Sequence, residues 1–320
     1  MSEPEELVVR GWEVLRLTSE TLQADVVPAL GGTVVSLRRR RDDLELLWQT
    51  PWGLRHRGSL DLAGSAEQLM YASYPGGWHS IFPNGGDSAA AYGADWGHDG
   101  EARVTWLDWE WTGAKLVLQG RLVRSPFTLT REVSLREDEI TITDTVVNVG
   151  GEHIDVMWGQ QVAFGDALIG ADTVVHAGAT TVRPDTRASS TTSYEDLLPW
   201  PRAYGRYGLV NLRSIAEDDS RKAYLADFAD ATVTVRRPSQ ELTVELRWEE
   251  FVWPYVWYSL ETGGSEGFPW YGRGRYLAFT PSTSWPARGV HDARRISSSV
   301  LRIHADGKRT AYLTVKITSA

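Results

Sequence analysis

Histidine and carboxylate side chains gather in one stretch of the sequence and offer groups for proton transfer. His79 is followed by His98, and Asp95, Asp99 and Glu101 lie within seven residues of one another around it. Imidazole and carboxyl groups suit general acid–base catalysis because their surroundings can tune their pKa values towards 7. We hypothesise that His98, with Glu101 and His79, supplies an acid–base set. The alternative is that each is a loop residue bonded to backbone or water.

Other chemistries find less support in these residues. The spacing of the histidines and acids fits no known metal-ligand pattern, and a metal site needs three or more convergent ligands, so we predict no metal site. The chain has no Cys, which excludes thiolate nucleophiles and disulfides. No nucleophile-elbow motif supports a Ser/His/Asp triad.

Tryptophan is the compositional outlier, with 15 in 320 residues. An indole ring buries a large area in a core, but it also offers a flat face on which the apolar C–H face of a sugar ring can stack. The neighbouring residues are Gly, Asn, Asp and His rather than aliphatic, so both interpretations stay open. The tryptophans crowd two stretches, one with Trp78, Trp96, Trp106, Trp109 and Trp111, the other with Trp248, Trp253, Trp257, Trp270 and Trp285.

Alternation of apolar and polar residues, typical of strands with one buried face, dominates the chain and is clearest in 127–135. Helical periodicity is scarce, and its best stretch is 194–198. Many antiparallel strands without a break predict an all-β fold, a large antiparallel sandwich that forms one domain over 1–320. The long irregular segments 50–100 and 177–219 are where we expect a site, because loops on a rigid sheet often carry function.

Charge and hydropathy exclude some classes of partner. The net charge is −9, from 33 basic and 42 acidic residues, whereas a nucleic-acid binder normally shows a basic excess. The one basic run, at 38–41, precedes two aspartates and is interpreted as a solvated turn. No apolar run approaches the roughly 18–20 residues of a membrane span, and the acidic start shows no signal peptide. We expect a cytoplasmic protein that binds neither nucleic acid nor membrane; its oligomeric state stays open.

Several motifs, in order along the chain, resemble those of the aldose 1-epimerase (galactose mutarotase-like) family. Segment 27–37 (VPALGGTVVSL) resembles the opening strands of that family, 76–86 (GGWHSIFPNGG) its Trp- and Asn-bearing loop, and 98–102 (HDGEA) its His-Gly-Glu segment with one extra residue. Segment 156–165 (VMWGQQVAFG) resembles the strand that carries the catalytic His, and 276–284 (YLAFTPSTS) the one that carries the catalytic Glu. The resemblance implies a β-supersandwich, in agreement with the strand pattern.

The resemblance also implies a reaction, the interconversion of sugar anomers. The cyclic hemiacetal opens, the aldehyde rotates, and the ring closes on its other face while an acid and a base exchange protons with it. No metal or organic cofactor is required. The positions that match the catalytic His and Glu are Gln161 and Thr280, which only donate and accept hydrogen bonds. The substrate-binding residues that we predict are Trp78, Asn84, Trp158, Gln161, Trp257 and Thr280.

Three functions for a small-molecule carbohydrate partner follow. The first is an aldose 1-epimerase-like isomerase whose acid–base pair has moved, with His98 and a carboxylate as proton carriers. The second is a noncatalytic carbohydrate-binding protein. The third is another sugar reaction on the same scaffold, such as elimination, hydrolysis or epimerisation at another carbon, because a scaffold does not fix its chemistry.

Overall fold

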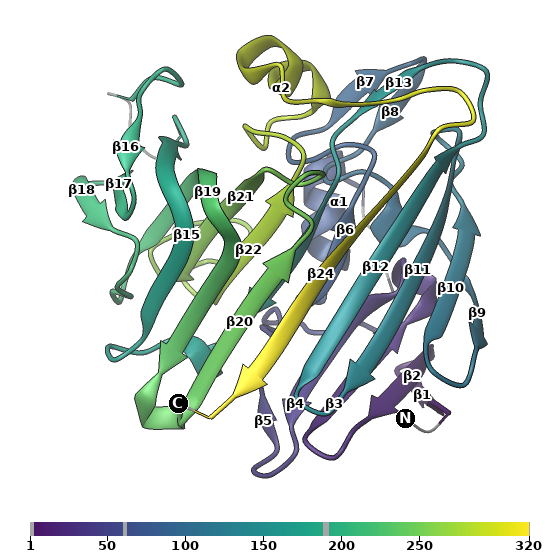
Figure 1. The fold of residues 1–320 in the computed structure, drawn as a ribbon, viewed down its shortest axis with the longest axis horizontal. Helices are drawn as coiled ribbons and strands as arrows, with labels where there is room; N and C mark the ends of the chain where they lie inside the picture. The colour runs from purple at the N-terminus through teal and green to yellow at the C-terminus, as the bar shows by residue number, and fades with distance from the viewer. Residues whose placement is uncertain (1–2, 60–62, 188–191, 320) are drawn as a thin grey trace.

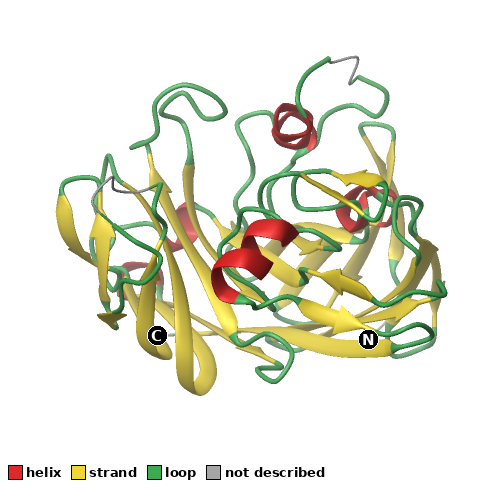
Figure 2. Ribbon diagram, turned by 90° about the horizontal axis from the view of Figure 1, so that it is seen from above, coloured by secondary structure: helices red, strands yellow, loops and turns green. Residues whose placement is uncertain are grey.

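The computed structural model describes residues 3–59, 63–187 and 192–319. Within them, antiparallel strands form two layers that face each other (Figure 1). Seen from above, loops and short helices gather over the outer side of one layer (Figure 2). The all-β architecture expected from the alternation of apolar and polar residues is confirmed, because that alternation buries one face of each strand.

The front layer contains the most regular strands of the protein. In β11 and β12, every second residue is buried, as the sequence pattern predicts. The pairing runs antiparallel from β9 to β20. In spatial order the layer comprises β9 (Asp108–Trp111), β10 (Leu116–Arg121), β11 (Phe127–Arg136), β12 (Glu139–Asn148), β24 (Lys308–Thr318) and β20 (Leu242–Trp248).

The back layer joins the beginning of the chain to segments more than 200 residues away. Two adjacent strands of this layer, β14 and β22, carry Gln161 and Thr280, the positions that match the catalytic His and Glu of the resembled family. In spatial order it comprises β1 (Glu5–Val9), β2 (Trp12–Thr18), β3 (Leu22–Val27), β4 (Thr33–Arg39), β6 (Trp78–Ile81), β14 (Gly159–Phe164), β22 (Arg275–Ser282) and β21 (Tyr255–Thr262), with β5 (Leu44–Glu45) beside β4.

Two long strands, β15 (Val174–Pro184) and β19 (Ser220–Arg237), connect the layers. Residues 232–237 of β19 pair with β20 of the front layer, whereas residues 220–225 pair with β21 of the back layer. Strand β15 follows β19 through both parts, with a register shift between Ala177 and Ala179. The two layers are therefore one continuous sheet folded over on itself.

Short strands complete the set: β16 (Leu198–Pro199) beside β15, and the pairs β7 (Ala89–Ala91) with β8 (Ala94–Trp96), β13 (Ile154–Val156) with β23 (Leu301–Ile303), and β17 (Arg202–Gly205) with β18 (Gly208–Asn211).

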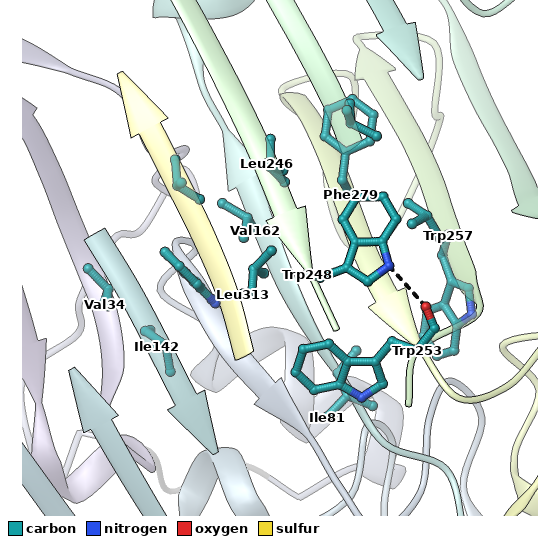
Figure 3. Close-up of a cluster of buried hydrophobic side chains, with 14 of the residues drawn as sticks. Val34, Ile81, Ile142, Val162, Leu246, Trp248, Trp253, Trp257, Phe279 and Leu313 are labelled. Atoms are coloured by element: carbon teal, nitrogen blue, oxygen red, sulfur yellow. Dashed lines mark hydrogen bonds between the residues drawn. The ribbon is translucent and has the colours of Figure 1, made fainter. Parts of the chain in front are cut away.

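The core lies between the two layers (Figure 3). Ile142 and Leu313 enter it from the front layer, and Val162 and Phe279 from the back layer. Trp248 donates its indole N–H to the carbonyl of Trp253, at 3.0 Å. Because side chains alternate along a strand, burial of Val162 and Phe279 turns the preceding Gln161 and the following Thr280 to the other side of the back layer.

The helical segments differ from the sequence prediction. Residues 194–198 form no helix, whereas helices occur at α1 (Ala66–Ser73) and α2 (Val290–Ser297). Helix α1 begins with a capping box, in which Ser65 accepts from the Gln68 N–H and the Gln68 side chain bonds back to Ser65. In the part of the chain that the structure describes, 3₁₀ turns lie at Pro28–Leu30, Ala102–Val104, Asp166–Leu168 and Pro238–Gln240. No helix within the described residues is long and apolar enough to cross a membrane.

Candidate functional site

A pocket lies on the outer side of the back layer, where β6, β14, β21 and β19 form its floor. Its empty space, including the open mouth, is about 860 Å³. Helix α1 and the loops that carry Trp270, Asp99 and Arg187 form its walls. The residues that line it are Trp48, Glu67, Met70, Tyr71, Tyr74, His79, Gly86, His98, Asp99, Gln161, Ala163, Asp185, Arg187, Lys222, Ala223, Tyr224, Trp257, Tyr258, Ser259, Trp270, Tyr276 and Ala287.

One row of side chains crosses the floor of this pocket. His79 pairs with Gln161, and Trp257 pairs with both Thr280 and Tyr224. The register on either side of Gln161, Gly159 with Ser282 and Val162 with Phe279, places Thr280 opposite it. Directly paired residues present their side chains on the same face. The structure thus brings Gln161 and Thr280 together, although Thr280 is buried and is not part of the lining.

The next row across the same strands consists of small residues with one exception. Ala163 pairs with Ala278, Ala278 with Ser259, and Ser259 with Lys222. Small side chains leave a hollow beside the larger row of Tyr224 and its neighbours. Lys222 stands at one end of this hollow, with its side chain exposed to it.

Gln161 is the predicted binding residue with the clearest access to the pocket. Its Nε2 donates to the Tyr74 hydroxyl at 3.0 Å. Its Oε1 has no hydrogen-bond partner within the described residues, so this oxygen can accept from a ligand hydroxyl. Trp257, also predicted, lines the pocket while its indole N–H donates to the carbonyl of Ser284 at 2.6 Å.

His79 also lies in the lining but is covered. Its side chain is 2% exposed, and neither ring nitrogen has a partner in the described residues. Its ring meets that of Tyr74 edge to face, with centroids 5.1 Å apart. Burial lowers the pKa of His79 to about 3, because the charged imidazolium loses its hydration. His79 is therefore neutral near pH 7; its one ring N–H can donate a hydrogen bond, but the imidazolium that would act as a general acid is absent at this pH.

His98 and Asp99 form the titratable pair of the pocket wall. The His98 Nε2 lies 3.8 Å from the Asp99 Oδ2, and the imidazole ring packs near Tyr71. Asp99 is fixed in place because its Oδ1 accepts from the Gly86 N–H at 2.8 Å. Gly86 has a φ of +71°, and a Cβ there would lie 2.0 Å from the carbonyl oxygen of Ala287, so only glycine fits.

Glu101 and Asn84 are held by bonds away from the pocket lining. The Glu101 carboxylate accepts from the backbone N–H groups of Val123 and Arg124 and from the Ser125 hydroxyl. Asn84 is fully buried, donates to the carbonyl of Asp87, and accepts from the Val290 N–H. Both side chains tie loops together, so the structure groups His98 with Asp99 instead of Glu101.

Trp78 and Trp158 lie in the core, away from the pocket lining. Both are fully buried: Trp78 faces inward from β6, and Trp158 directly precedes β14. Trp78 donates its N–H to the Gln160 Oε1 at 2.6 Å, and the Trp158 ring packs edge to face on Trp253. Of the three tryptophans predicted to bind substrate, Trp257 lines the pocket, whereas Trp78 and Trp158 do not.

A buried polar network supports the floor from beneath. Arg131 and Asp144, both completely buried, form an ion pair in which Arg131 Nε and Nη2 each donate to a carboxylate oxygen at 2.8 Å. The Gln160 Nε2 donates to the same carboxylate at 3.0 Å, and Ser80 bonds to both charged groups. This network fixes β6 and β14, and with them the pocket residues His79 and Gln161 on the opposite face.

Sequence reasoning missed the charged groups on the side of the pocket formed by β15 and β19. Asp185 accepts from Arg187 Nη2 at 3.0 Å and from the Tyr224 hydroxyl at 3.1 Å. Arg187 also reaches Asp87, at 3.3 Å. The only signal was that Asp185 and Arg187 fall in the irregular segment 177–219; Lys222 lies outside it and carried none. No three His, Asp or Glu side chains in the described residues are placed to hold a metal ion.

Comparison with solved structures identifies the fold. A candidate aldose 1-epimerase from Klebsiella pneumoniae matches with a TM-score of 0.75 at 12% identity, covering 99% of this chain and 83% of that one. A galactose mutarotase-like protein from Lactobacillus casei matches with a TM-score of 0.68 at 15% identity (95% and 99% covered). A galactose mutarotase-like protein from Clostridium acetobutylicum matches with a TM-score of 0.65 at 13% identity, and the match covers 99% of each chain. No family model and no curated protein matches the sequence. The chain thus has the galactose mutarotase-like fold, as the motifs in 27–37 through 276–284 implied.

Proposed function

We propose that the pocket binds a carbohydrate and that the protein interconverts the anomers of an aldose. The observation that carries the proposal is the row from His79 through Gln161 to Trp257, which lines a pocket in a fold of the mutarotase-like type. The row and the walls combine aromatic rings with hydrogen-bonding groups. Such a combination suits a sugar, whose ring faces are apolar and whose rim carries hydroxyls.

The reaction needs two proton carriers, and His98 with Asp99 supplies them. One member of the pair accepts the proton of the anomeric hydroxyl while the other protonates the ring oxygen, and the ring opens. After the aldehyde rotates, the reverse transfers close the ring on its other face. Each positioned proton carrier commonly contributes about 10²–10⁴-fold to a rate. Gln161 and Tyr74 hold sugar hydroxyls by hydrogen bonds and transfer no protons.

A second candidate, a noncatalytic carbohydrate-binding protein, is favoured by a specific observation. The central strands β14 and β22 carry Gln161 and Thr280, which exchange no protons near neutral pH. Their neighbour His79 is held neutral by burial. In this case the same pocket binds a sugar and releases it unchanged.

Anomer exchange followed by polarimetry or NMR on freshly dissolved aldoses distinguishes the two. We expect the protein to accelerate exchange, His98→Ala to abolish the acceleration while calorimetry still detects sugar binding, and His56→Ala, at an exposed position outside the pocket, to change neither. Binding without any acceleration would establish the second candidate. If no aldose binds and none exchanges faster, both are refuted.

A further inference from the structure

Lys222 is a cation that lines the pocket and has no counter-ion in direct contact among the residues that the structure describes. It stands on β19 opposite Ser259, at the end of the row of small residues. Within the described residues, its ammonium group forms no ion pair and no hydrogen bond. The small side chains of Ala278 and Ala163 leave open the hollow beside it.

The acidic groups nearest to Lys222 in the pocket have other partners. Asp185 accepts three hydrogen bonds from Arg187, two from its guanidinium group at 3.0 and 3.2 Å and one from its backbone N–H at 2.9 Å, and one from Tyr224. Asp99 accepts from Gly86 and faces His98 on the other wall. Glu261, which also attracts Lys222, accepts from the backbone N–H groups of Gly263 and Ser265. Glu67, on α1, is exposed at the mouth. These carboxylates attract Lys222 from a distance, but within the described residues none of them forms an ion pair with it.

The surroundings act against the positive charge of Lys222 in the empty pocket. Loss of hydration among the pocket walls lowers the pKa of Lys222, and repulsion by Arg187 lowers it further. Attraction by Asp185, Asp99 and Glu261 raises this pKa, but less, so it stays below its usual value. An anion bound in the hollow would reverse both effects, since it would bring opposite charge and hydrogen-bond acceptors to the ammonium group.

We propose that Lys222 binds an anionic substituent of the carbohydrate, so that the pocket is selective for acidic sugars: phosphorylated, sulfonated or carboxylated. This inference rests on the proposed function, because it assigns the substrate class of the same pocket. Arg187, on the same side of the pocket, is already paired with Asp185 at 3.0 Å and Asp87 at 3.3 Å, so the anion is assigned to Lys222. The hydroxyls of the sugar then face Gln161 and the pair His98–Asp99.

Calorimetry with a neutral hexose, the corresponding hexose 6-phosphate, a 6-sulfonate and a hexuronic acid tests the inference and separates the three kinds of anion. We expect at least one acidic sugar to bind roughly tenfold or more tightly than the neutral hexose, the size of effect of one charge-assisted hydrogen bond. Its affinity should fall as salt is raised. Lys222→Met should remove this advantage and leave the neutral sugar unaffected, and Lys222→Arg should keep most of it.

The matched control is Lys308→Met, which removes an exposed lysine from β24 of the front layer. It should bind every sugar as the wild type does. Equal affinities for neutral and acidic sugars, or an advantage that survives Lys222→Met, would overturn the inference while leaving carbohydrate binding intact. If inorganic phosphate binds in a Lys222-dependent way but no sugar binds, the anion site stands and the proposed function fails.

Discussion

Replacement of His79 by phenylalanine should protect the protein against acid. The His79 side chain is 2% exposed, and its pKa is lowered by burial from 6.5 to about 3. In the unfolded chain the imidazole takes up a proton below about pH 6.5, whereas in the folded protein it does so only near pH 3. The unfolded state therefore binds more protons in this window, so stability is complete above pH 6.5 and is lost as the pH falls.

The expected loss follows from the size of the shift. Each pH unit within the window costs about 1.4 kcal/mol, so His79 should destabilise the wild type by roughly 3 kcal/mol between pH 6.5 and pH 4. Phenylalanine has a similar shape and does not titrate. Since neither ring nitrogen of His79 has a partner in the described residues, the variant loses no hydrogen bond and should match the wild type at pH 7 to within about 1 kcal/mol.

Urea unfolding from pH 7 to pH 4 measures the effect as the difference between wild type and His79→Phe at each pH. The difference should grow as the pH falls. His56→Phe, which removes an exposed histidine, is the matched control and should follow the wild type throughout. Parallel profiles for wild type and His79→Phe would refute the argument that burial holds this imidazole neutral.

Further variants test the support of the pocket. Arg131→Met leaves the Asp144 carboxylate buried without its ion-pair partner, so chemical denaturation should show a free energy of unfolding about 3–5 kcal/mol lower. The double variant Arg131→Met/Asp144→Leu should regain most of this stability, and equal losses in the single and double variants would contradict this account. Gly86→Ala places a Cβ 2.0 Å from a carbonyl oxygen at a φ of +71°, so it should lower the free energy of unfolding by at least about 2 kcal/mol. Because the Gly86 N–H holds Asp99, the variant should also slow any anomer exchange. An unchanged Tm would count against this reasoning. Ser65→Ala removes the cap of α1 and should cost about 1 kcal/mol in thermal unfolding, which Ser65→Asp should restore.

The sequence alone predicted the architecture because strand burial has a period of two residues. The alternation in 127–135 predicted β11 with its inward face correctly. The helix α1 was missed because its eight residues show little amphipathic pattern, and its clearest local signal is the cap at Ser65. The motifs also predicted that Gln161 and Thr280 would meet, since each lies at a fixed place in a strand and the two strands are neighbours.

The tertiary structure decided which loop residues reach the pocket. His98, Asp99 and Glu101 are nearly adjacent in the chain. Glu101 accepts from the backbone N–H groups of Val123 and Arg124, whereas Asp99 turns to the pocket through its bond with Gly86. Spacing cannot decide this, because loop side chains follow no repeating pattern. Nor could it reveal Lys222 as an unpaired cation, since that depends on which residues distant strands place beside it. Composition and periodicity therefore determined the sheet, and long-range packing determined the site.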